Sequence, residues 1–439
     1  MKRRLAFIAV AFVAVVVIGA GIIAGLALKK PSSPLSGAVI NDPALVKRGE
    51  YLAIAGDCAG CHTTSNGKPF AGGLAMPIPM LGMIYTANIT PDPRTGIGAW
   101  SLAEFDLAVR YGVDKSGENL YPAMPYVSYA KISDDNIKAL YAYFKYAVLP
   151  VDEPTRASTI SWPLNMRWPV QLWNVAFFDG ERYQDKHGRD PAWNRGAYLV
   201  QGLTHCGTCH TPRGVAFQEL ALDETGPRYL GGSVLAGWQG YNITSDANAG
   251  IGTWTSDQLV QYLTTGNLHG VAQAAGPMGE AVQHSFSRLT NADVAAIAAY
   301  VKSVPPVSDG NAPSRQKLGA PSNVVASLRG FSFNNDTEDS ARIFLGACAS
   351  CHRWSGAGTP DGYYPSLFHN STVGAANADN LAQVIIHGIR RNTVGEDISM
   401  PAFGAVLSDK EIAALVNFLT TQFGNKSASI TDNEVKSLR

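Results

Sequence analysis

The sequence predicts an all-α protein made of three copies of one small helical domain, preceded by an apolar N-terminal helix. Three observations indicate this. A pentapeptide of the form Cys-x-x-Cys-His occurs three times and ends at His62, His210 and His352. Two shorter segments recur in the same order in the first two copies, and an amphipathic helix closes every copy. Repetition at an interval of roughly 90–140 residues is typical of tandem domains rather than of a solenoid.

A chain of 439 residues is long enough for two to four domains. The predicted order is an N-terminal membrane anchor or signal, a first repeat, a linker, a second repeat, a linker, a third repeat and a short tail. These segments cover residues 1–30, 41–150, 151–190, 191–305, 306–333, 334–426 and 427–439. The tail is polar from Asn425 onward, so we expect it to be mobile.

The N-terminal segment contains 24 residues, Leu5 to Leu28, without a charge, and three cationic residues precede it. A helix of this length spans about 36 Å, enough to cross a bilayer core of about 30 Å. A cleaved export signal is the alternative, with candidate cleavage sites after Ala27 and Ala38. The length favours a retained anchor. In either case the positive N-terminus predicts that the rest of the chain leaves the cytoplasm.

The repeats share their opening, middle and closing segments. Arg48-Gly49 and Arg195-Gly196 open the first two, each on a short helix that leads into the pentapeptide. An Asn-Ile-Thr triplet and a Gly-Ile-Gly-x-Trp segment then precede a middle helix, and the third repeat has its counterpart around Asn380–Ile389. Capping boxes are expected at Ser101 with Glu104, Thr255 with Gln258, and Ser408 with Glu411. The closing helices are expected over 133–147, 290–304 and 408–423, where the apolar positions follow the helical period.

The pentapeptides carry the chemistry. Two cysteines at i and i+3 share one face of a helical turn, and the histidine at i+4 lies over the same face. This pattern is typical of the covalent attachment of haem c, in which both thiols bind one porphyrin and the histidine coordinates its iron. We therefore predict three covalently bound haems. The attachment residues are Cys58, Cys61, Cys206, Cys209, Cys348 and Cys351, and the proximal ligands are His62, His210 and His352.

A zinc site or a redox dithiol is the alternative reading of such a motif. All six cysteines of the chain lie in the three motifs, so none remains for a disulfide or as a further zinc ligand. A structural zinc site would use two Cys-x-x-Cys pairs, and three pairs cannot be divided in this way. Three haems are therefore the better explanation.

The sixth iron ligands are predicted to be Met124, Met278 and Met400. Each lies beside a proline, after the middle helix and shortly before the closing helix of its repeat. Core packing is the ordinary role of a lone methionine, and it is the alternative here. Met124 has rivals in the first repeat. They are Met76, Met80 and Met83, which precede the middle helix.

Histidines could in principle replace these methionines, but those outside the motifs lack a counterpart at one shared position. They are His187, His205, His269, His284, His369 and His387. A methionine ligand would raise the reduction potential relative to a second histidine. The free ring nitrogen of each proximal histidine should donate to a carbonyl, and for His352 we predict that of Pro365.

Composition and the linkers narrow the range of partners. The formal net charge is zero and 16% of residues are charged, which argues against a nucleic-acid-binding protein. Prolines in the first linker alternate with Trp162, Trp168 and Trp173. This segment is too aromatic for a flexible tether, so we expect it to pack between domains or to meet a partner subunit.

These motifs together give a resemblance. A Cys-x-x-Cys-His motif followed by Met beside Pro before a last helix resembles class I cytochrome c. Three such domains over residues 41–425 resemble the triple-haem cytochrome c subunit of bacterial membrane-bound alcohol, aldehyde, gluconate and related sugar dehydrogenases. Segments such as Asn88-Ile89-Thr90 and 121–126 carry the resemblance. Members of that family often have a cleaved signal, whereas the apolar segment here is long enough to remain.

The resemblance implies an electron-transfer subunit at the periplasmic face of the inner membrane, and no catalytic residues in this chain. It would take electrons from a flavin, quinoprotein or molybdenum dehydrogenase subunit and pass them to ubiquinone, a cytochrome or a terminal oxidase. Two alternatives stay open. One is a haem enzyme of the peroxidase or thiosulfate-oxidising type with an open iron. The other is an oxidase-associated relay that works without a dehydrogenase.

Overall fold

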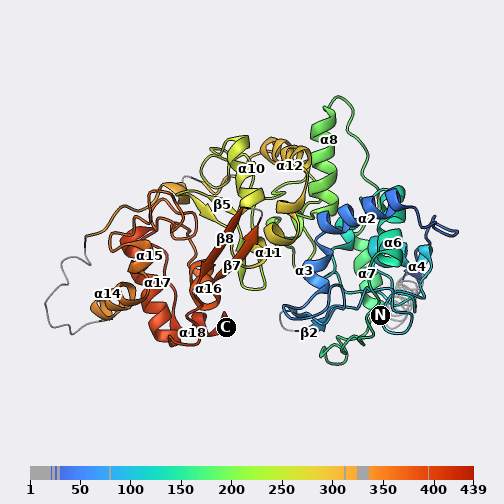
Figure 1. Cartoon of the computed structure of the whole chain (residues 1–439), viewed down its shortest axis with the longest axis horizontal. Helices are drawn as coiled ribbons and strands as arrows, with labels where there is room; N and C mark the ends of the chain where they lie inside the picture. The colour runs from blue at the N-terminus through green and yellow to red at the C-terminus, as the bar shows by residue number, and fades with distance from the viewer. Residues whose placement is uncertain are drawn as a thin grey trace, which may run out of the picture. The chain divides into compact units, whose positions relative to one another are not determined.

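The computed structural model describes residues 21, 25–26, 30–78, 81–310, 313–323, 336–393 and 395–439 (Figure 1). The predicted membrane anchor or signal therefore lies almost entirely outside the described residues. Among those residues, no helix is both long and apolar enough to span a bilayer.

The chain divides into two compact units. The first consists of Met1–Ala53, Cys61–Gln184 and Val215–Gln218, and the second of Ile54–Gly60, Asp185–Gly214 and Glu219–Arg439. The second unit thus contains both the second and the third predicted repeat. Most of the first repeat lies in the first unit, and the short segment before and within its Cys-x-x-Cys motif is part of the second.

The first repeat and its linker are mainly helical, with one β-hairpin. Their elements are α2 (Pro43–Ala55), α3 (Cys58–His62), β1 (Ala75–Ile78), β2 (Gly82–Tyr85), α4 (Leu102–Tyr111), α5 (Tyr126–Tyr129), α6 (Asp134–Tyr146) and α7 (Trp168–Phe177). Strands β1 and β2 pair antiparallel, with Met76 opposite Ile84. The core lies where α4 and α6 meet, and its rings include Phe105 and Tyr141, whose centroids are 5.5 Å apart.

The second repeat follows the same order with additional short strands. Its elements are α8 (Pro191–Tyr198), the π-helix η1 (Leu199–Leu203), α9 (Gly207–His210), β3 (Ser233–Leu235), β4 (Trp238–Gly240), α10 (Ser256–Thr265), β5 (Asn267–Leu268), β6 (Ala272–Gln273), α11 (Gly276–His284), the 3₁₀ helix η2 (Phe286–Arg288) and α12 (Asn291–Ser303). Strand β3 pairs with β4, and β5 with β6.

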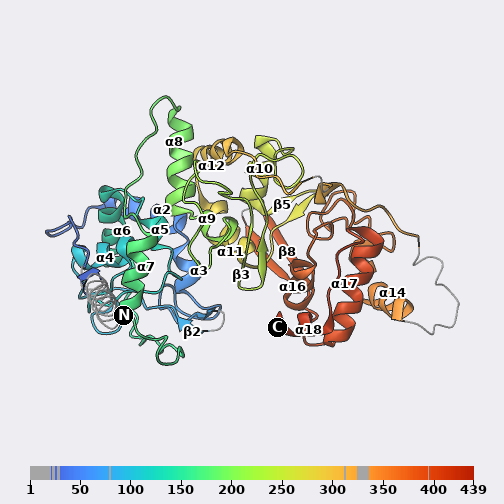
Figure 2. The same ribbon diagram turned by 180° about the vertical axis from the view of Figure 1, so that it is seen from behind.

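The third repeat is preceded by the 3₁₀ helix η3 (Arg315–Lys317). It consists of α14 (Asp336–Ala347), α15 (Ala349–His352), α16 (Asp379–His387), β7 (Ile389–Thr393), β8 (Glu396–Met400), α17 (Asp409–Phe423) and α18 (Asp432–Ser437). Its core is apolar and includes the fully buried Phe344, Leu415 and Phe423. The hairpin β7–β8 lies beside α11 of the second repeat in both views (Figures 1 and 2), and α11 contacts β7.

The Arg-Gly pairs that open the first two repeats explain how the first and last helices cross. A Cβ atom added to Gly49 would lie 1.9 Å from the Ala139 carbonyl oxygen, and one added to Gly196 would lie 2.0 Å from that of Ala296. Only glycine, which has no Cβ atom, therefore allows the first helix to lie this close to the backbone of the closing helix. The neighbouring arginines reinforce it, since Arg195 bonds both carboxylate oxygens of Asp293, at 2.8 and 2.7 Å.

The helix boundaries agree closely with the sequence patterns. The predicted capping boxes at Ser101, Thr255 and Ser408 are all present, with side chain and backbone bonded in both directions. Each closing helix begins directly after its predicted first residue. The middle helix of the third repeat is α16, within two residues of the predicted range.

One expectation about the fold was confirmed only in part, and another was wrong. The all-α prediction missed four two-stranded antiparallel sheets among the described residues, because strands of two to five residues leave no periodic signal. The tail was expected to be mobile, but it folds back on the third repeat. Ile430 and Val435 are buried there, and Arg439 donates to the Leu407 carbonyl at 2.7 Å. A few apolar residues in a polar segment were enough to dock it.

Candidate haem-binding sites

Each Cys-x-x-Cys-His motif forms one turn of helix, as its spacing predicts. The motifs occupy α3, α9 and α15, or begin one residue before them. In the second repeat the N–H of His210 donates to the Cys206 carbonyl at 3.0 Å, and in the third that of His352 donates to the Cys348 carbonyl at 2.9 Å. None of the six cysteines forms a disulfide. The turn therefore presents two thiols and an imidazole together, three times over.

The three histidines share one hydrogen-bond pattern. Their Nδ1 atoms lie 2.6, 2.7 and 2.9 Å from the carbonyl oxygens of Ala87, Tyr241 and Pro365. A carbonyl only accepts, so Nδ1 must carry the proton. Nε2 then keeps its lone pair for a metal, as in histidine ligands generally. The prediction that His352 donates to Pro365 is confirmed.

Burial keeps these imidazoles neutral. Loss of solvent lowers the pKa of His62, His210 and His352 below the ordinary value, although each bonded carbonyl acts in the opposite direction. For His210 the nearby Arg315 guanidinium lowers the pKa further. A neutral imidazole is the form that coordinates iron, so the local environment prepares each ring for that role.

The Asn-Ile-Thr triplets explain why the accepting carbonyl stands in the same place in the first two repeats. The Asn88 carboxamide oxygen accepts from the N–H and hydroxyl of Thr90, at 2.9 and 2.7 Å. Its amide donates to the Val151 carbonyl at 2.7 Å. Asn242 bonds Thr244 and the Val307 carbonyl at the same distances. This fixes the residue just before each asparagine, which is the one that accepts from the histidine.

A threonine directly after the first and second motifs adds to this frame. The Thr63 hydroxyl accepts from the N–H of Phe70 at 3.1 Å, and that of Thr211 from the N–H of Leu230 at 3.1 Å. Their signal was available in the sequence, since both motifs read Cys-His-Thr. The third motif has Arg353 instead, consistent with its greater divergence.

The three candidate methionines lie in different local structures. Met124 is in the turn before α5, Met278 is in the first turn of α11, and Met400 is the last residue of β8. All three are half-buried, as are the six cysteines and the three proximal histidines. Met400 and Cys348 both pack against the apolar core of the third repeat. Coordination by these methionines remains a prediction.

The rival methionines of the first repeat lie on the hairpin. Met76 belongs to β1, where it is opposite Ile84, and Met83 belongs to β2, opposite Pro77. Met80 lies outside the described residues. The hairpin precedes α4, whereas Met124 follows it, so the assignment of Met124 by position in the repeat is unchanged.

Unsatisfied buried donors support a carboxylate-bearing group in the second repeat. Arg315 Nε and Gln316 Nε2 are buried and have no partner among the described residues. The Arg315 guanidinium lies 4.4 Å from the centre of the Tyr241 ring, on the residue whose carbonyl accepts from His210. Arg315 Nη1 donates to the Ala249 carbonyl at 2.7 Å, so Nε is the guanidinium donor that lacks an acceptor, and a buried donor without an acceptor is costly. Haem carries two propionate carboxylates, so these residues fit that group.

The residues directly before the first cysteines differ sharply between the first two repeats. Asp57 precedes Cys58, and burial, with the nearby Glu280 carboxylate, raises its pKa to about 7. His205 precedes Cys206, and burial lowers its pKa to about 4. Both residues have positive φ angles, 49° and 35°. Within the second unit the His205 ring bonds the backbone of Gly56. The sequence placed these residues next to the motifs but gave no sign of their electrostatics.

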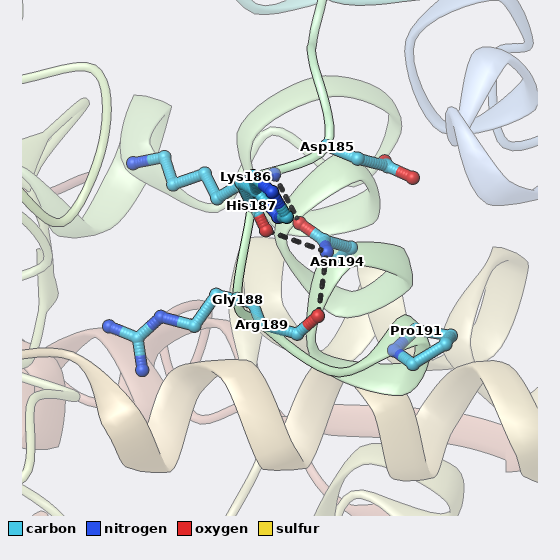
Figure 3. Close-up of a pocket in the computed structure, with 7 residues that line it drawn as sticks. All are labelled: Asp185, Lys186, His187, Gly188, Arg189, Pro191 and Asn194. Carbon is cyan, nitrogen blue, oxygen red and sulfur yellow. Dashed lines mark hydrogen bonds between the residues drawn. The ribbon is translucent and has the colours of Figure 1, made fainter.

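A separate polar pocket of about 340 Å³ lies where the chain enters α8 (Figure 3). Its lining consists of Asp185, Lys186, His187, Gly188, Arg189, Pro191 and Asn194. Asn194 holds it together, accepting from the Lys186 N–H at 2.8 Å and donating to the Lys186 and Arg189 carbonyls. The pocket contains none of the haem-motif residues. His187 therefore lies on the wall of this pocket, outside the haem motifs.

Comparison with known proteins gives one match to a family and several to individual chains. The family described as cytochrome c oxidase, cbb3-type, subunit III matches residues 335–419, which cover most of the third repeat. The fructose dehydrogenase cytochrome subunit of Gluconobacter japonicus is 40% identical over 90% of this chain and 82% of its own. The gluconate 2-dehydrogenase cytochrome c subunit of Pantoea cypripedii is 42% identical over 90% of both chains.

A third relative has the same extent of similarity. The cytochrome c subunit of the quinone-dependent alcohol dehydrogenase of Gluconacetobacter polyoxogenes is 42% identical over 91% of this chain and 85% of its own. These matches span all three Cys-x-x-Cys-His motifs rather than a single domain. With its helical attachment turns and neutral, carbonyl-bonded histidines, the chain belongs to the family of cytochrome c subunits of fructose, gluconate and alcohol dehydrogenases.

Proposed function

We propose that this protein is an electron relay that carries three covalent haem c groups, one in each repeat. The observation that supports this most strongly is the threefold occurrence of one arrangement. A Cys-x-x-Cys-His turn is followed each time by a carbonyl that accepts from histidine Nδ1. Each iron, once bound, supplies one-electron oxidation and reduction.

The side chains of the protein would hold and tune these centres. The cysteines would attach the porphyrin, and the histidine Nε2 atoms together with Met124, Met278 and Met400 would be the ligands that hold each iron. A thioether ligand favours reduced iron and raises its potential. Carbonyl bonds at Nδ1 fix the ring orientation of each histidine. If protein side chains supply all the ligands that the porphyrin leaves open, the chain would exchange electrons without binding a substrate at iron.

The relatives indicate the place of this relay. We infer that it docks to a catalytic dehydrogenase subunit of flavin, quinoprotein or molybdenum type and passes electrons to ubiquinone, a cytochrome or a terminal oxidase. The formal net charge of zero suits lasting association better than an encounter steered by charge. We further propose that the apolar segment Leu5–Leu28 holds the chain at the periplasmic face of the inner membrane.

Haem content and ligand exchange test this proposal. The full chain is produced in a host that matures cytochromes c, and covalent haem is measured against protein after acid–acetone extraction of free haem. We expect three haems per chain and no change in the reduced spectrum under carbon monoxide. Fewer than three haems would contradict the relay. A stoichiometric response to carbon monoxide would instead indicate an open iron and favour a haem enzyme.

A further inference from the structure

The first linker exposes a group of apolar side chains on the first unit. Trp162 is 78% exposed, Leu164 52% and Trp168 52%, with Met166 and Val175 also exposed. These five residues, named here the Trp162 patch, lie on 162–166 and on α7. We expected this aromatic linker to pack between domains or to meet a partner subunit. Trp173 agrees with packing between repeats, since its indole N–H donates to the Ala216 carbonyl at 2.8 Å, whereas the five residues of the Trp162 patch are exposed to solvent.

Helix α7 shows why this face is outward. The one fully buried residue of α7 is polar, since Asn174 accepts from the Tyr126 hydroxyl at 2.7 Å. Trp168, Leu172 and Val175 are spaced at i, i+4 and i+7 and therefore lie on one face. Trp168 and Val175 on this face are exposed. A surface helix of a soluble domain normally has the opposite arrangement.

The charge pattern of the segment suits contact with a lipid surface. Between Ala157 and Phe178 there are 22 residues and a single charge, that of Arg167. The segment has no carboxylate to repel an anionic membrane. Tryptophan is also enriched where proteins meet the headgroup region, because its ring is apolar and its N–H is polar.

The position of the patch within the unit supplies the second argument. Lys30 is the second residue after the apolar segment Leu5–Leu28, and its Nζ lies 2.6 Å from the position of a Cβ atom on Gly117. Two residues further along the same turn, the Asn119 side chain donates to the Arg167 carbonyl at 3.3 Å. Tyr121 donates to the Leu164 carbonyl at 2.8 Å. One turn thus contacts both Lys30 and the base of the patch.

We propose that the Trp162 patch inserts into the headgroup and upper acyl region of an anionic bilayer, as a second membrane contact beside the N-terminal segment. A chain that leaves the bilayer at Lys30 brings the adjoining patch to the membrane surface. Interfacial segments of this kind penetrate about 5–10 Å. The inference rests on the proposed membrane location of the chain. It adds that residues 162–175 contact lipid directly and hold the first unit against the bilayer.

Photolabelling of the full haem-loaded chain tests this contact. The chain is reconstituted into phosphatidylethanolamine–phosphatidylglycerol vesicles that contain a lipid with a diazirine near the glycerol backbone. After irradiation and trypsin digestion, peptides 157–167 and 168–182 should carry lipid adducts. Peptide 146–156 is a matched control, because it comes from the same unit and contains Leu149, which is 80% exposed.

Two variants make the test specific. In Trp162→Ser/Leu164→Ser/Met166→Ser/Trp168→Ser we expect the adducts on 157–182 to fall to the level of the control peptide. In Ile40→Ser/Leu149→Ser, which removes exposed apolar side chains elsewhere in the unit, labelling of 157–182 should be unchanged. Haem content confirms that both variants fold.

Each of the other possible results of the labelling experiment contradicts a specific part of the proposal. A vesicle-bound chain with 157–182 labelled no more than 146–156 contradicts the lipid contact and leaves the membrane location intact. A chain that stays in the supernatant contradicts both. Cross-links from 157–182 to residues 5–28, or protection of the patch by a copurified dehydrogenase subunit, would show that protein covers it and would contradict the proposal.

Discussion

The first and second repeats have the same backbone frame around their haem motifs but surround it with different chemistry. In the first, Phe70 packs edge-on against Phe144 and Tyr143, with ring centres 5.2 and 6.1 Å apart. In the second, Leu230 takes the position of Phe70, bonded in the same way to the threonine that follows the motif. The second repeat thus has a polar network where the first has the aromatic contacts of Phe70.

The network consists of four side chains. The Tyr300 hydroxyl donates to Glu224 at 2.7 Å and accepts from Gln201 at 2.8 Å. Lys186 donates to the other oxygen of Glu224 at 2.5 Å, and belongs to the segment that lines the polar pocket of Figure 3. Burial, together with Glu224, raises the pKa of Tyr300, so its phenol stays neutral and keeps its proton as a donor.

A longer loop accounts for the difference. The N–H of Gly72 donates to the carbonyl of His62, which lies 10 residues earlier in the chain. In the second repeat the N–H of Gly232 donates to the carbonyl of His210, which lies 22 residues earlier. Glu224 lies in the additional segment. The haem-binding frame therefore tolerates a large insertion between two of its fixed points, and the insertion changes the charge beside one centre without changing the bonds that hold it.

The largest expected effect tests whether the first and second repeats place their methionine ligands at corresponding positions. Met278→Leu and Met124→Leu should each open one iron, so that the reduced chain binds one carbon monoxide and the affected potential falls by on the order of 0.1 V. Spectra and redox titration measure both. Met83→Leu, on the hairpin, is the control and should change neither. If Met83→Leu, and not Met124→Leu, led to carbon monoxide binding and a lower potential, the methionine ligands of the first two repeats would not lie at corresponding positions.

The next effect concerns the residues before the first cysteines. Because burial raises the pKa of Asp57, the folded chain keeps a proton there that the unfolded chain releases above about pH 4. Stability should therefore fall as pH rises from about 4 to about 7. For His205, whose pKa is lowered, the unfolded chain binds the proton below about pH 6.5. Stability should rise with pH from about 4 to about 6.5.

Single substitutions separate these opposing effects. Asp57→Asn should abolish the decrease in stability between about pH 4 and 7, and His205→Asn should abolish the increase between about pH 4 and 6.5. Each change amounts to at most roughly 4 kcal/mol in the free energy of unfolding. Denaturant titrations at a series of pH values provide the measurement. Identical pH profiles for the two variants would mean that the two positions are not electrostatically distinct.

The smallest effect concerns the polar network itself. Tyr300→Phe removes the hydroxyl that bonds both Gln201 and Glu224, which keep their bond to each other at 3.1 Å, and Glu224→Gln weakens the bond to Lys186. We expect each to lower the free energy of unfolding by about 1–3 kcal/mol, followed by the absorbance of the haems. Asp257→Asn, at an exposed position of the same repeat, should cost less than about 0.5 kcal/mol. Equal losses in all three variants would show that the network contributes nothing specific.

The parts that could be predicted from the sequence depend on local spacing. Cysteines at i and i+3 with histidine at i+4 form one helical turn wherever they occur, and Ser408 with Glu411 forms a cap from residues three apart. Even the Pro365 carbonyl could be named, because it lies only 13 residues from His352. The hairpins and the docked tail were missed, since short strands and a few apolar residues leave too weak a pattern.

The sequence by itself thus determined three attachment turns, their histidines and the helices that enclose them, because these follow from backbone periodicity. The tertiary structure alone decided which distant groups meet. Arg391 is fully buried and donates to the Thr265 carbonyl at 2.9 Å and to the Gln273 side chain at 3.1 Å, more than a hundred residues away. A buried guanidinium needs every available acceptor, and where those acceptors lie is a property of the folded chain.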